Sequence, residues 1–388
     1  MNKKTRRIAI NVGGGFVPGM NTVVAGAALA AGGSGWELVG IRDGFDGLLH
    51  PGDHPDAGLV LLDRQLVENL DPAARGVLGQ SPRVDPFHVR QVNEDNLVEE
   101  VDMSDRLLER LKEEKIDALI SVVSGRGLSI LYKLHRKGIN TVCIPRSIEN
   151  DIAATMVSFG FNSALSFTIE MLDRVSQGVM SARRIGVVEV LGGQSGWLAL
   201  QAGIAVVADA ILIPEIPCDL HTVAANLKEK MSISRPYGLV VVAEGAQLIE
   251  KERVEHDESS PGSLKDSLSP LARGDSGEHI IQRSGQAAET VAKQLQLLLP
   301  EETYPMVLGP WVRGGPPTAV DRQLGLAYGA GAVKALNAGE NGVMVAFTPP
   351  NINFVPLAEA INKVRTVPAE SEFIQIARAL NISLGGAL

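Results

Sequence analysis

The sequence contains few aromatic residues and only two cysteines. Aromatic residues make up 4% of the 388 positions, so a hydrophobic core must rest on Ala, Val, Ile and Leu. Cys143 and Cys218 lie in the apolar, strand-like runs TVCIP and IPCDL. Two separate thiols in such runs predict no disulfide framework and are typical of the reducing cytoplasm, where we expect the protein to act.

The sequence also lacks long hydrophobic runs and an excess of positive charge. No apolar run approaches the ~18 residues that suggest a membrane span. The basic start MNKKTRRIAI is not followed by the apolar segment of a signal peptide. The formal net charge is −9, which argues against a broad nucleic-acid surface. We therefore expect neither a membrane nor a nucleic acid as a partner.

Glycine, by contrast, is abundant, with 41 residues. Many glycines follow short runs rich in β-branched residues, such as RRIAINV, IDALISVV, RRIGVVEV and YGLVVVAEG. Amphipathic or Ala-rich segments such as VDMSDRLLERLKEEK separate these runs. Strands that are apolar on both faces and alternate with helices predict an α/β protein with mostly parallel sheets. The length of 388 residues allows two domains of roughly 100–200 residues each.

Ligands of such sheets bind beyond the carboxyl ends of the strands, and three turns there carry glycines or polar residues. Residues 11–21, NVGGGFVPGMN, contain glycines that let the backbone approach a phosphate group. Residues 124–127, SGRG, repeat this pattern at the start of a predicted helix. Residues 144–155, IPRSIENDIAAT, combine a cation, a hydroxyl group and two acids. We interpret all three as candidate ligand-binding turns, and the third gives the strongest signal.

One segment interrupts the alternation of strands and helices. Residues 249–279, IEKERVEHDESSPGSLKDSLSPLARGDSGEH, are charged, rich in Ser, Pro and Gly, and poor in aromatic residues. This composition predicts a mobile surface insertion at residues 250–284. The alternative is a segment that binds a partner or closes over a ligand.

Ten collinear motifs run through the chain on both sides of this insertion. They are, in order, GGGFVPGMN, GIRDGFDGLL, LGQSPRVDPF, PRSIENDI, FGFNSAL, VVEVLGGQSGWLAL, ADAILIPEIP, VVAEGA, LGPWVRGGPPTAVDR and VPLAEAINKVRTVP. In this order they resemble the motifs of the phosphofructokinase family, above all its bacterial branch, which contains ATP- and pyrophosphate-dependent members. The resemblance implies the phosphofructokinase fold, with two Rossmann-like, three-layer α/β domains and mostly parallel sheets.

The resemblance also implies how the chain divides and what it does. Residues 1–160 with about 312–360 would form the donor domain, and residues 161–311 with about 361–388 the sugar-phosphate domain. The implied reaction is transfer of a phosphoryl group to the 1-hydroxyl of fructose 6-phosphate. In the family an aspartate acts as base, Mg²⁺ bridges donor oxygens and arginines stabilise the transferring charge. A homo-oligomer, dimer or tetramer, is implied, because arginines of a neighbouring subunit complete the sugar-phosphate site.

Carried over position by position, the resemblance marks a set of site residues. The positions implied to bind ATP or pyrophosphate are Gly14, Gly15, Gly125, Arg126, Gly127 and Arg146. The implied catalytic positions are Arg83, Ser147, Glu149 and Asp151. The positions implied to bind the phosphorylated sugar are Arg184, Gly192, Glu244 and Arg313. No residue is assigned as a metal ligand.

Several positions depart from the family pattern where the chemistry takes place. Arg126 occupies the position of a magnesium-associated aspartate, and Glu149 that of the catalytic aspartate. Gly193 replaces an arginine, and Tyr304 and Pro310 replace an arginine and a histidine of the sugar-phosphate site. A guanidinium repels a divalent cation, so we expect the usual magnesium geometry to be lost. A base displaced by about 1 Å can cost on the order of 10²-fold in rate.

These departures predict a protein that binds a phosphorylated sugar or a phosphate donor with ordinary Mg-dependent 6-phosphofructokinase activity lost or strongly impaired. Such a protein would act as a sensor, a regulator or a structural subunit. The alternative is an active phosphotransferase that uses ATP or pyrophosphate on fructose 6-phosphate or a related sugar, because arginine can hold phosphate without a metal. A dinucleotide-dependent dehydrogenase is disfavoured, since GGGFVPG lacks the G-x-G-x-x-G spacing.

Overall fold

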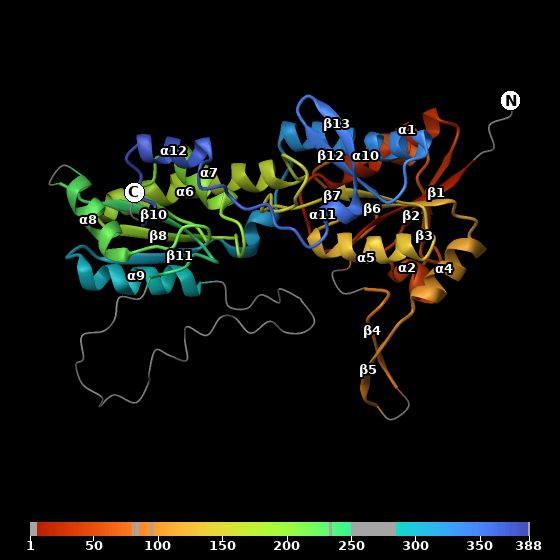
Figure 1. Ribbon diagram of the computed structural model, residues 1–388, viewed down its shortest axis with the longest axis horizontal. Helices are drawn as coiled ribbons and strands as arrows, with labels where there is room; N and C mark the ends of the chain where they lie inside the picture. The colour runs from red at the N-terminus through yellow and green to blue at the C-terminus, as the bar shows by residue number, and fades with distance from the viewer. Residues whose placement is uncertain are drawn as a thin grey trace.

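A computed structural model gives the structure of residues 6–79, 81, 85–93, 96–232, 235–249 and 285–386. Arg83 and the predicted insertion at residues 250–284 lie outside these described residues. The described chain forms two lobes, each built around a β-sheet, which lie next to each other along the longest axis of the molecule (Figure 1). We call them the large-sheet lobe and the small-sheet lobe.

A seven-stranded sheet forms the centre of the large-sheet lobe. Its strands, in spatial order, are β13 (Asn351–Pro356), β12 (Val343–Thr348), β7 (Thr141–Pro145), β6 (Ala118–Val123), β1 (Arg7–Val12), β2 (Glu37–Ile41) and β3 (Leu59–Leu61). The inner strands run parallel, and only the outer pairs β12–β13 and β2–β3 are antiparallel. Strands β6 and β7 are buried along their whole length because helices cover both faces of the sheet.

The helices of this lobe divide between the two faces. One face packs against α1 (Met20–Gly33), α3 (Arg64–Glu68) and α10 (Ala319–Ala338). The other packs against α2 (Asp46–Leu49), α4 (Ser104–Glu113), α5 (Gly125–Arg136) and α11 (Leu357–Ala360). Helices α1 and α10 approach closely because Gly26 and Gly329 carry no side chain, and a Cβ atom at either position would overlap the backbone of the other helix.

The small-sheet lobe contains a four-stranded parallel sheet. Its strands, in spatial order, are β11 (Thr303–Val307), β8 (Ile185–Val190), β10 (Gly238–Ala243) and β9 (Ala210–Leu212). One face is covered by α6 (Phe161–Ala182), α7 (Trp197–Ala205) and α12 (Glu372–Ala379). The other is covered by α8 (Leu220–Lys230) and α9 (Gln286–Leu298).

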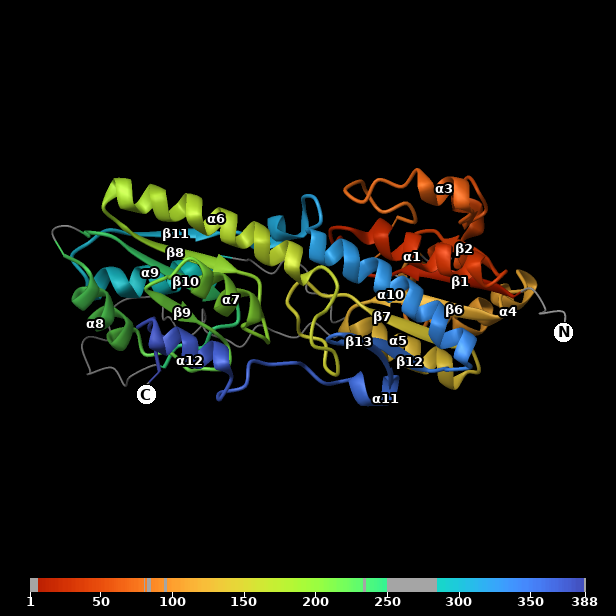
Figure 2. The ribbon, with the colours of Figure 1, turned by 90° about the horizontal axis from the view of Figure 1, so that it is seen from above.

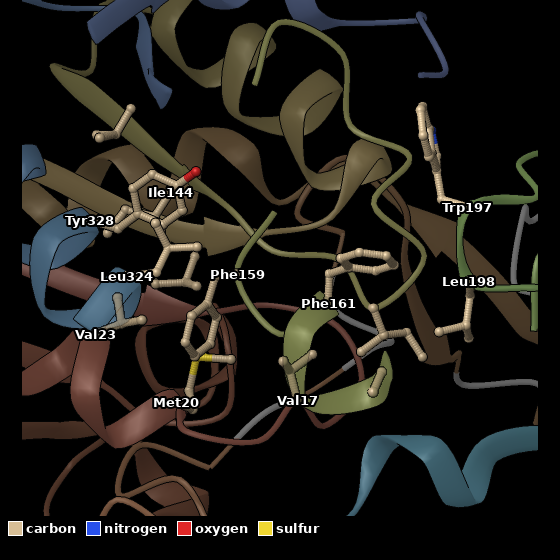
Figure 3. Packing of buried hydrophobic residues seen from close by; sticks show 14 of the residues in the cluster. Val17, Met20, Val23, Ile144, Phe159, Phe161, Trp197, Leu198, Leu324 and Tyr328 are labelled. Atoms are coloured by element: carbon tan, nitrogen blue, oxygen red, sulfur yellow. The ribbon is translucent and has the colours of Figure 1, made fainter. Parts of the chain in front are cut away.

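The lobes share one continuous core. A single cluster of buried apolar side chains runs from Met20 and Tyr328 through Phe159 and Phe161 to Trp197 (Figure 3). Helices α6 and α10 meet above this junction, nearly end to end (Figure 2). Shared apolar burial of this kind stabilises the relative placement of the lobes, because separating them would expose the cluster to water.

Two 3₁₀ helices and a β-hairpin complete the described part of the fold. The 3₁₀ helices η1 (Pro51–Asp53) and η3 (Gly309–Arg313) lie in connections, and η3 leads the chain back towards α10. Strands β4 (Val89–Val92) and β5 (Val98–Val101) form an antiparallel hairpin that projects from the large-sheet lobe (Figure 1).

The architecture confirms the predicted fold class, an α/β protein with two three-layer units and mostly parallel sheets. The exact domain boundaries stay a prediction. Cys143 and Cys218 are buried free thiols, as their apolar surroundings predict. None of the helices in the described chain has the length and apolarity that crossing a bilayer requires.

Candidate functional site

The three candidate turns meet at one edge of the large sheet. They follow β1, β6 and β7, which are parallel neighbours, so their carboxyl ends lie side by side. The Gly13 N–H donates to the Val122 carbonyl oxygen over 3.0 Å, and the Arg146 N–H donates to the Val123 carbonyl oxygen over 2.9 Å. These bonds join each turn to the neighbouring strand, and the structure thereby brings the predicted donor-binding residues to a common edge.

Arg146 fills the space above the first glycine turn. Its side chain is buried, with 3% of the residue exposed, and its Nη1 group donates to the Gly15 carbonyl oxygen. Gly14 has a φ of 85°, in the left-handed region that favours glycine, and a Cβ atom there would collide with the Arg146 guanidinium. Gly14 is therefore required both by its backbone conformation and by the approach of the arginine.

A second guanidinium approaches the same turn. The Nη1 atom of Arg313, at the end of η3, lies 3.9 Å from the position that a Cβ atom of Gly15 would occupy. Burial, together with the positive charge of Arg313, lowers the pKa of Arg146 to about 9. Because each cation disfavours the other, the region around Gly14 and Gly15 attracts anions.

Hydrogen bonds within the turn after β7 hold its hydroxyl group and its two acids in place. The Ser147 Oγ group donates to Asp151 Oδ1 over 2.5 Å and accepts from the Glu149 N–H over 3.1 Å. Asn150 has a φ of 55°, and its side chain accepts from the Ser158 N–H over 2.9 Å. The left-handed residue reverses the chain between Glu149 and Asp151, so the two acids remain close to each other.

Glu149 lies where the two lobes meet. Burial and the negative charges of Asp151 and Glu244 raise the pKa of Glu149 to about 8, against the opposing effects of Arg313 and the Gly193 N–H. Two of these neighbours, Glu244 and Gly193, belong to the small-sheet lobe, while Asp151 belongs to the same turn as Glu149. A carboxyl group in this environment is mostly protonated at neutral pH and becomes a base in mildly alkaline solution.

The small-sheet lobe contributes the turns after β8 and β10. Gly192 has a φ of 145°, and its carbonyl oxygen accepts from the Gly245 N–H over 3.2 Å. The Glu244 N–H donates to the Val190 carbonyl oxygen over 3.0 Å. A Cβ atom on Gly193 would lie 3.5 Å from Glu244 Oε1. The predicted sugar-binding residues Gly192 and Glu244 thus lie side by side, opposite the turn that carries Glu149.

Other predicted residues lie apart from this group. Arg184 precedes β8, at the strand end opposite Gly192, and its Nε atom lies 2.8 Å from Glu302 Oε2. Arg126 is exposed in the first turn of α5, between Gly125 and Gly127. Arg126 and Arg146 both lie at the carboxyl ends of the parallel strands, but Arg126 is exposed and Arg146 is buried. The catalytic assignment of Arg83 falls on a residue outside the described chain.

One residue that supports the site was not singled out from the sequence. Arg365 donates from its backbone N–H to the Asp151 carbonyl oxygen over 2.7 Å, and from Nη1 to the Asn150 carbonyl oxygen over 3.2 Å. Its guanidinium lies 4.1 Å from the centre of the Trp197 ring. Arg365 therefore links the turn after β7 to α7 of the small-sheet lobe. The only sequence signal was its place in the closing motif VPLAEAINKVRTVP.

Similarity to known proteins covers most of this framework. Residues 7–336 match the family model described as Phosphofructokinase. The chain belongs to the phosphofructokinase family. The family and the bacterial branch predicted from the ten motifs are thereby confirmed.

Individual phosphofructokinases match the chain over its length. The ATP-dependent 6-phosphofructokinase of Chloroflexus aurantiacus is 34% identical over 389 residues, which cover 100% of both chains. ATP-dependent 6-phosphofructokinase 2 of Clostridium perfringens is 33% identical over 386 residues, 99% of this chain and 99% of its own. The solved structure of a pyrophosphate-dependent phosphofructokinase from Marinobacter aquaeolei superposes with a TM-score of 0.72 at 18% identity, over 99% of this chain and 93% of that one. The similarity to this solved structure shows that the two proteins share a fold.

The phosphofructokinase family implies Mg²⁺ and ATP in general, and the residues at this edge can be tested against the metal. Mg²⁺ requires hard oxygen ligands, usually one or two carboxylates together with phosphate oxygens. The charged side chain in the turn after β6 is the cation Arg126, and the turn after β7 begins with the cation Arg146 and carries Glu149, which is mostly protonated at neutral pH, and Asp151. Among the described residues, no group of three or more His, Cys, Asp and Glu side chains is arranged to hold a metal ion. The turns after β1 and β6 supply no carboxylate for a magnesium ion, and the nearest acids, Glu149 and Asp151, lie in the turn after β7.

Proposed function

We propose that the protein is an active phosphotransferase, which moves a phosphoryl group from ATP or pyrophosphate to fructose 6-phosphate or a related phosphorylated sugar. The observation that carries the proposal is the position of Glu149, which lies between the lobes near Asp151, Glu244 and Arg313. The names of the full-length relatives also support it. The predicted loss of activity receives no comparable support and stays an untested prediction.

The geometry suggests how the side chains divide the work. Glu149, once ionised, takes the proton of the sugar hydroxyl group while the oxygen of that hydroxyl group forms a bond to the transferring phosphorus. The bond from phosphorus to the rest of the donor breaks, and the leaving group, which is ADP from ATP or phosphate from pyrophosphate, keeps the electron pair. General-base help of this kind gives about 10²–10⁴-fold in rate. The guanidinium groups of Arg146 and Arg313 stabilise the negative charge of the transferring group, in a reaction that depends mainly on positioning and electrostatics.

The sugar would lie against the small-sheet lobe, along Gly192, Gly193 and Glu244. Arg184 is directed away from this region within one chain. A role for Arg184 in binding the sugar phosphate therefore requires a second subunit, in agreement with the proposed homo-oligomer. The number of subunits and a cytoplasmic location stay predictions.

A substrate panel tests the proposal. The purified full-length chain is incubated with ATP or pyrophosphate and with fructose 6-phosphate or other sugar phosphates, at pH values on both sides of 8, and the sugar bisphosphate is quantified. We expect turnover with at least one pair, and its loss in Glu149→Gln. A folded protein that binds these ligands but transfers no phosphoryl group would favour the earlier prediction of a sensor or regulatory protein.

A further inference from the structure

Arg146 is a buried cation that forms no ion pair with any residue in the described part of the chain. Its Nη1 group donates to the Gly15 carbonyl oxygen, and its Nε atom is buried with no hydrogen-bond partner among the described residues. Charged side chains are almost never fully buried unless they are paired, because an isolated charge loses its hydration. An anionic ligand beside the guanidinium would supply the missing negative charge.

The surroundings of Arg146 favour an anion and oppose a cation. Arg313 brings a second guanidinium to Gly15, and its charge acts directly on Arg146. The backbone N–H of Arg146 donates to the carbonyl oxygen of Val123, two residues before the start of α5, and the first turn of α5 carries no acidic residue. Helix N-termini carry a partial positive charge and free N–H groups, which adds to the attraction for anions.

The nearby acids lie in the turn after β7 and not in the two glycine turns. Asp151 accepts a hydrogen bond from Ser147 Oγ over 2.5 Å. Glu149 lies beside Asp151 and Glu244, and burial with these like charges favours its neutral form. Neutral carboxyl groups are weak ligands for Mg²⁺, which binds through charged carboxylates and phosphate oxygens.

We infer that Gly14, Gly15, Arg146 and Arg313, which we call the arginine site, bind the phosphate groups of the donor directly as a polyanion, with no divalent cation between protein and donor. The inference rests on the proposed function, and it concerns the form in which the donor binds. The family in general implies magnesium, so the prediction for this chain is a departure from its relatives. Arginine suits the task because its planar guanidinium binds phosphate through two parallel hydrogen bonds.

Calorimetric titration of the full-length chain with pyrophosphate tests the inference without relying on turnover. One titration contains EDTA and the other contains excess magnesium chloride. We expect binding in EDTA, with an affinity that stays equal or falls when magnesium is added, because the metal neutralises part of the charge that the arginines recognise. Binding only in the presence of magnesium, or binding that magnesium tightens by about tenfold or more, would overturn the inference.

Variants of Arg146 locate the binding. We expect Arg146→Gln to weaken pyrophosphate binding in EDTA by about 10²-fold, and Arg146→Lys to weaken it by about tenfold because lysine keeps the charge but loses the planar fork. Arg136→Gln is the matched control, since Arg136 is an exposed arginine at the far end of α5. Unchanged affinity in Arg146→Gln would contradict the inference. If that variant fails to fold, Arg313→Gln provides the same test.

Failure of the inference and failure of the proposed function give different results. Pyrophosphate that binds in EDTA to a chain that transfers no phosphoryl group supports the arginine site and refutes the phosphotransferase. Turnover together with binding that strictly requires magnesium supports the phosphotransferase and refutes metal-free binding.

Discussion

The two halves of the turn after β7 carry side chains of opposite charge, and in both halves the surroundings favour the neutral form of the side chain. At its start, Arg146 faces a second cation, Arg313, and its pKa falls to about 9. At its end, Glu149 faces the acids Asp151 and Glu244, and its pKa rises to about 8. Burial is the larger cause of both pKa shifts and nearby charges of the same sign add to it, so both groups are moved towards neutrality. The difference shows that the first half is suited to an anionic ligand and the second to a proton.

The largest effect should follow removal of the acidic half. We expect Glu149→Gln to lower kcat by about 10²–10⁴-fold, because the amide cannot accept the proton of the sugar hydroxyl group. Donor affinity, measured by calorimetry, should change by less than about twofold, since the arginine site remains intact. The shape of the side chain is nearly kept, so the fold should survive. A parallel loss of donor binding would show that the two halves are not separable.

A smaller effect is expected from the residue that holds the turn in place. Arg365→Ala removes the hydrogen bond from Nη1 to the Asn150 carbonyl oxygen and the contact with Trp197. We expect kcat to fall by about 10- to 10²-fold with little change in KM, because a shift of about 1 Å in a catalytic group has this effect. Steady-state kinetics measures kcat and KM separately. Arg365→Lys should restore part of kcat, and equal changes in kcat and KM would indicate a merely structural role.

The arginine half can be perturbed through its glycine. We expect Gly14→Ala to reduce the free energy of unfolding by about 1–3 kcal/mol from its left-handed φ alone, and further because the new Cβ atom meets the Arg146 guanidinium. Gly339→Ala is the matched control, since Gly339 has a φ of 83° and nothing within 4 Å of its added Cβ atom. Denaturant unfolding compares the two. Equal losses would mean that Arg146 moves away at no cost.

The acidic half should also be visible in the stability of the fold. Glu149 binds its proton more tightly in the folded chain, with a pKa of about 8 against an ordinary value of 4.5. The folded state therefore holds more protons between these values, and the free energy of unfolding should fall as the pH rises through this window. Glu149→Gln should flatten the fall. Urea unfolding at several pH values measures this dependence in both proteins. An identical slope of the free energy of unfolding against pH in the variant would contradict the raised pKa of Glu149.

Local patterns in the sequence predict the fold well, because apolar strands and the turns that follow them are properties of short segments. The meeting of the turns after β1, β6 and β7 follows from parallel strand order alone. The burial of Arg146 over Gly14 does not, because it depends on two segments far apart in the chain. The contact of Arg365 with Asn150 and Trp197 has the same origin. Arg184 shows the opposite case. The motif match assigned it to the sugar-phosphate site, but within one chain its side chain is paired with Glu302, away from Gly192.

The pH dependence of kcat/KM tests the central claim most directly, since it reports the ionisations of the free protein. With the pair of donor and sugar that turns over, kcat/KM should rise as Glu149 ionises at about pH 8 and fall as Arg146 loses its proton at about pH 9. The residual activity of Glu149→Gln should lack the rising limb. A rising limb centred near the ordinary glutamate pKa of 4.5, or a folded protein without turnover at any pH, would contradict the account.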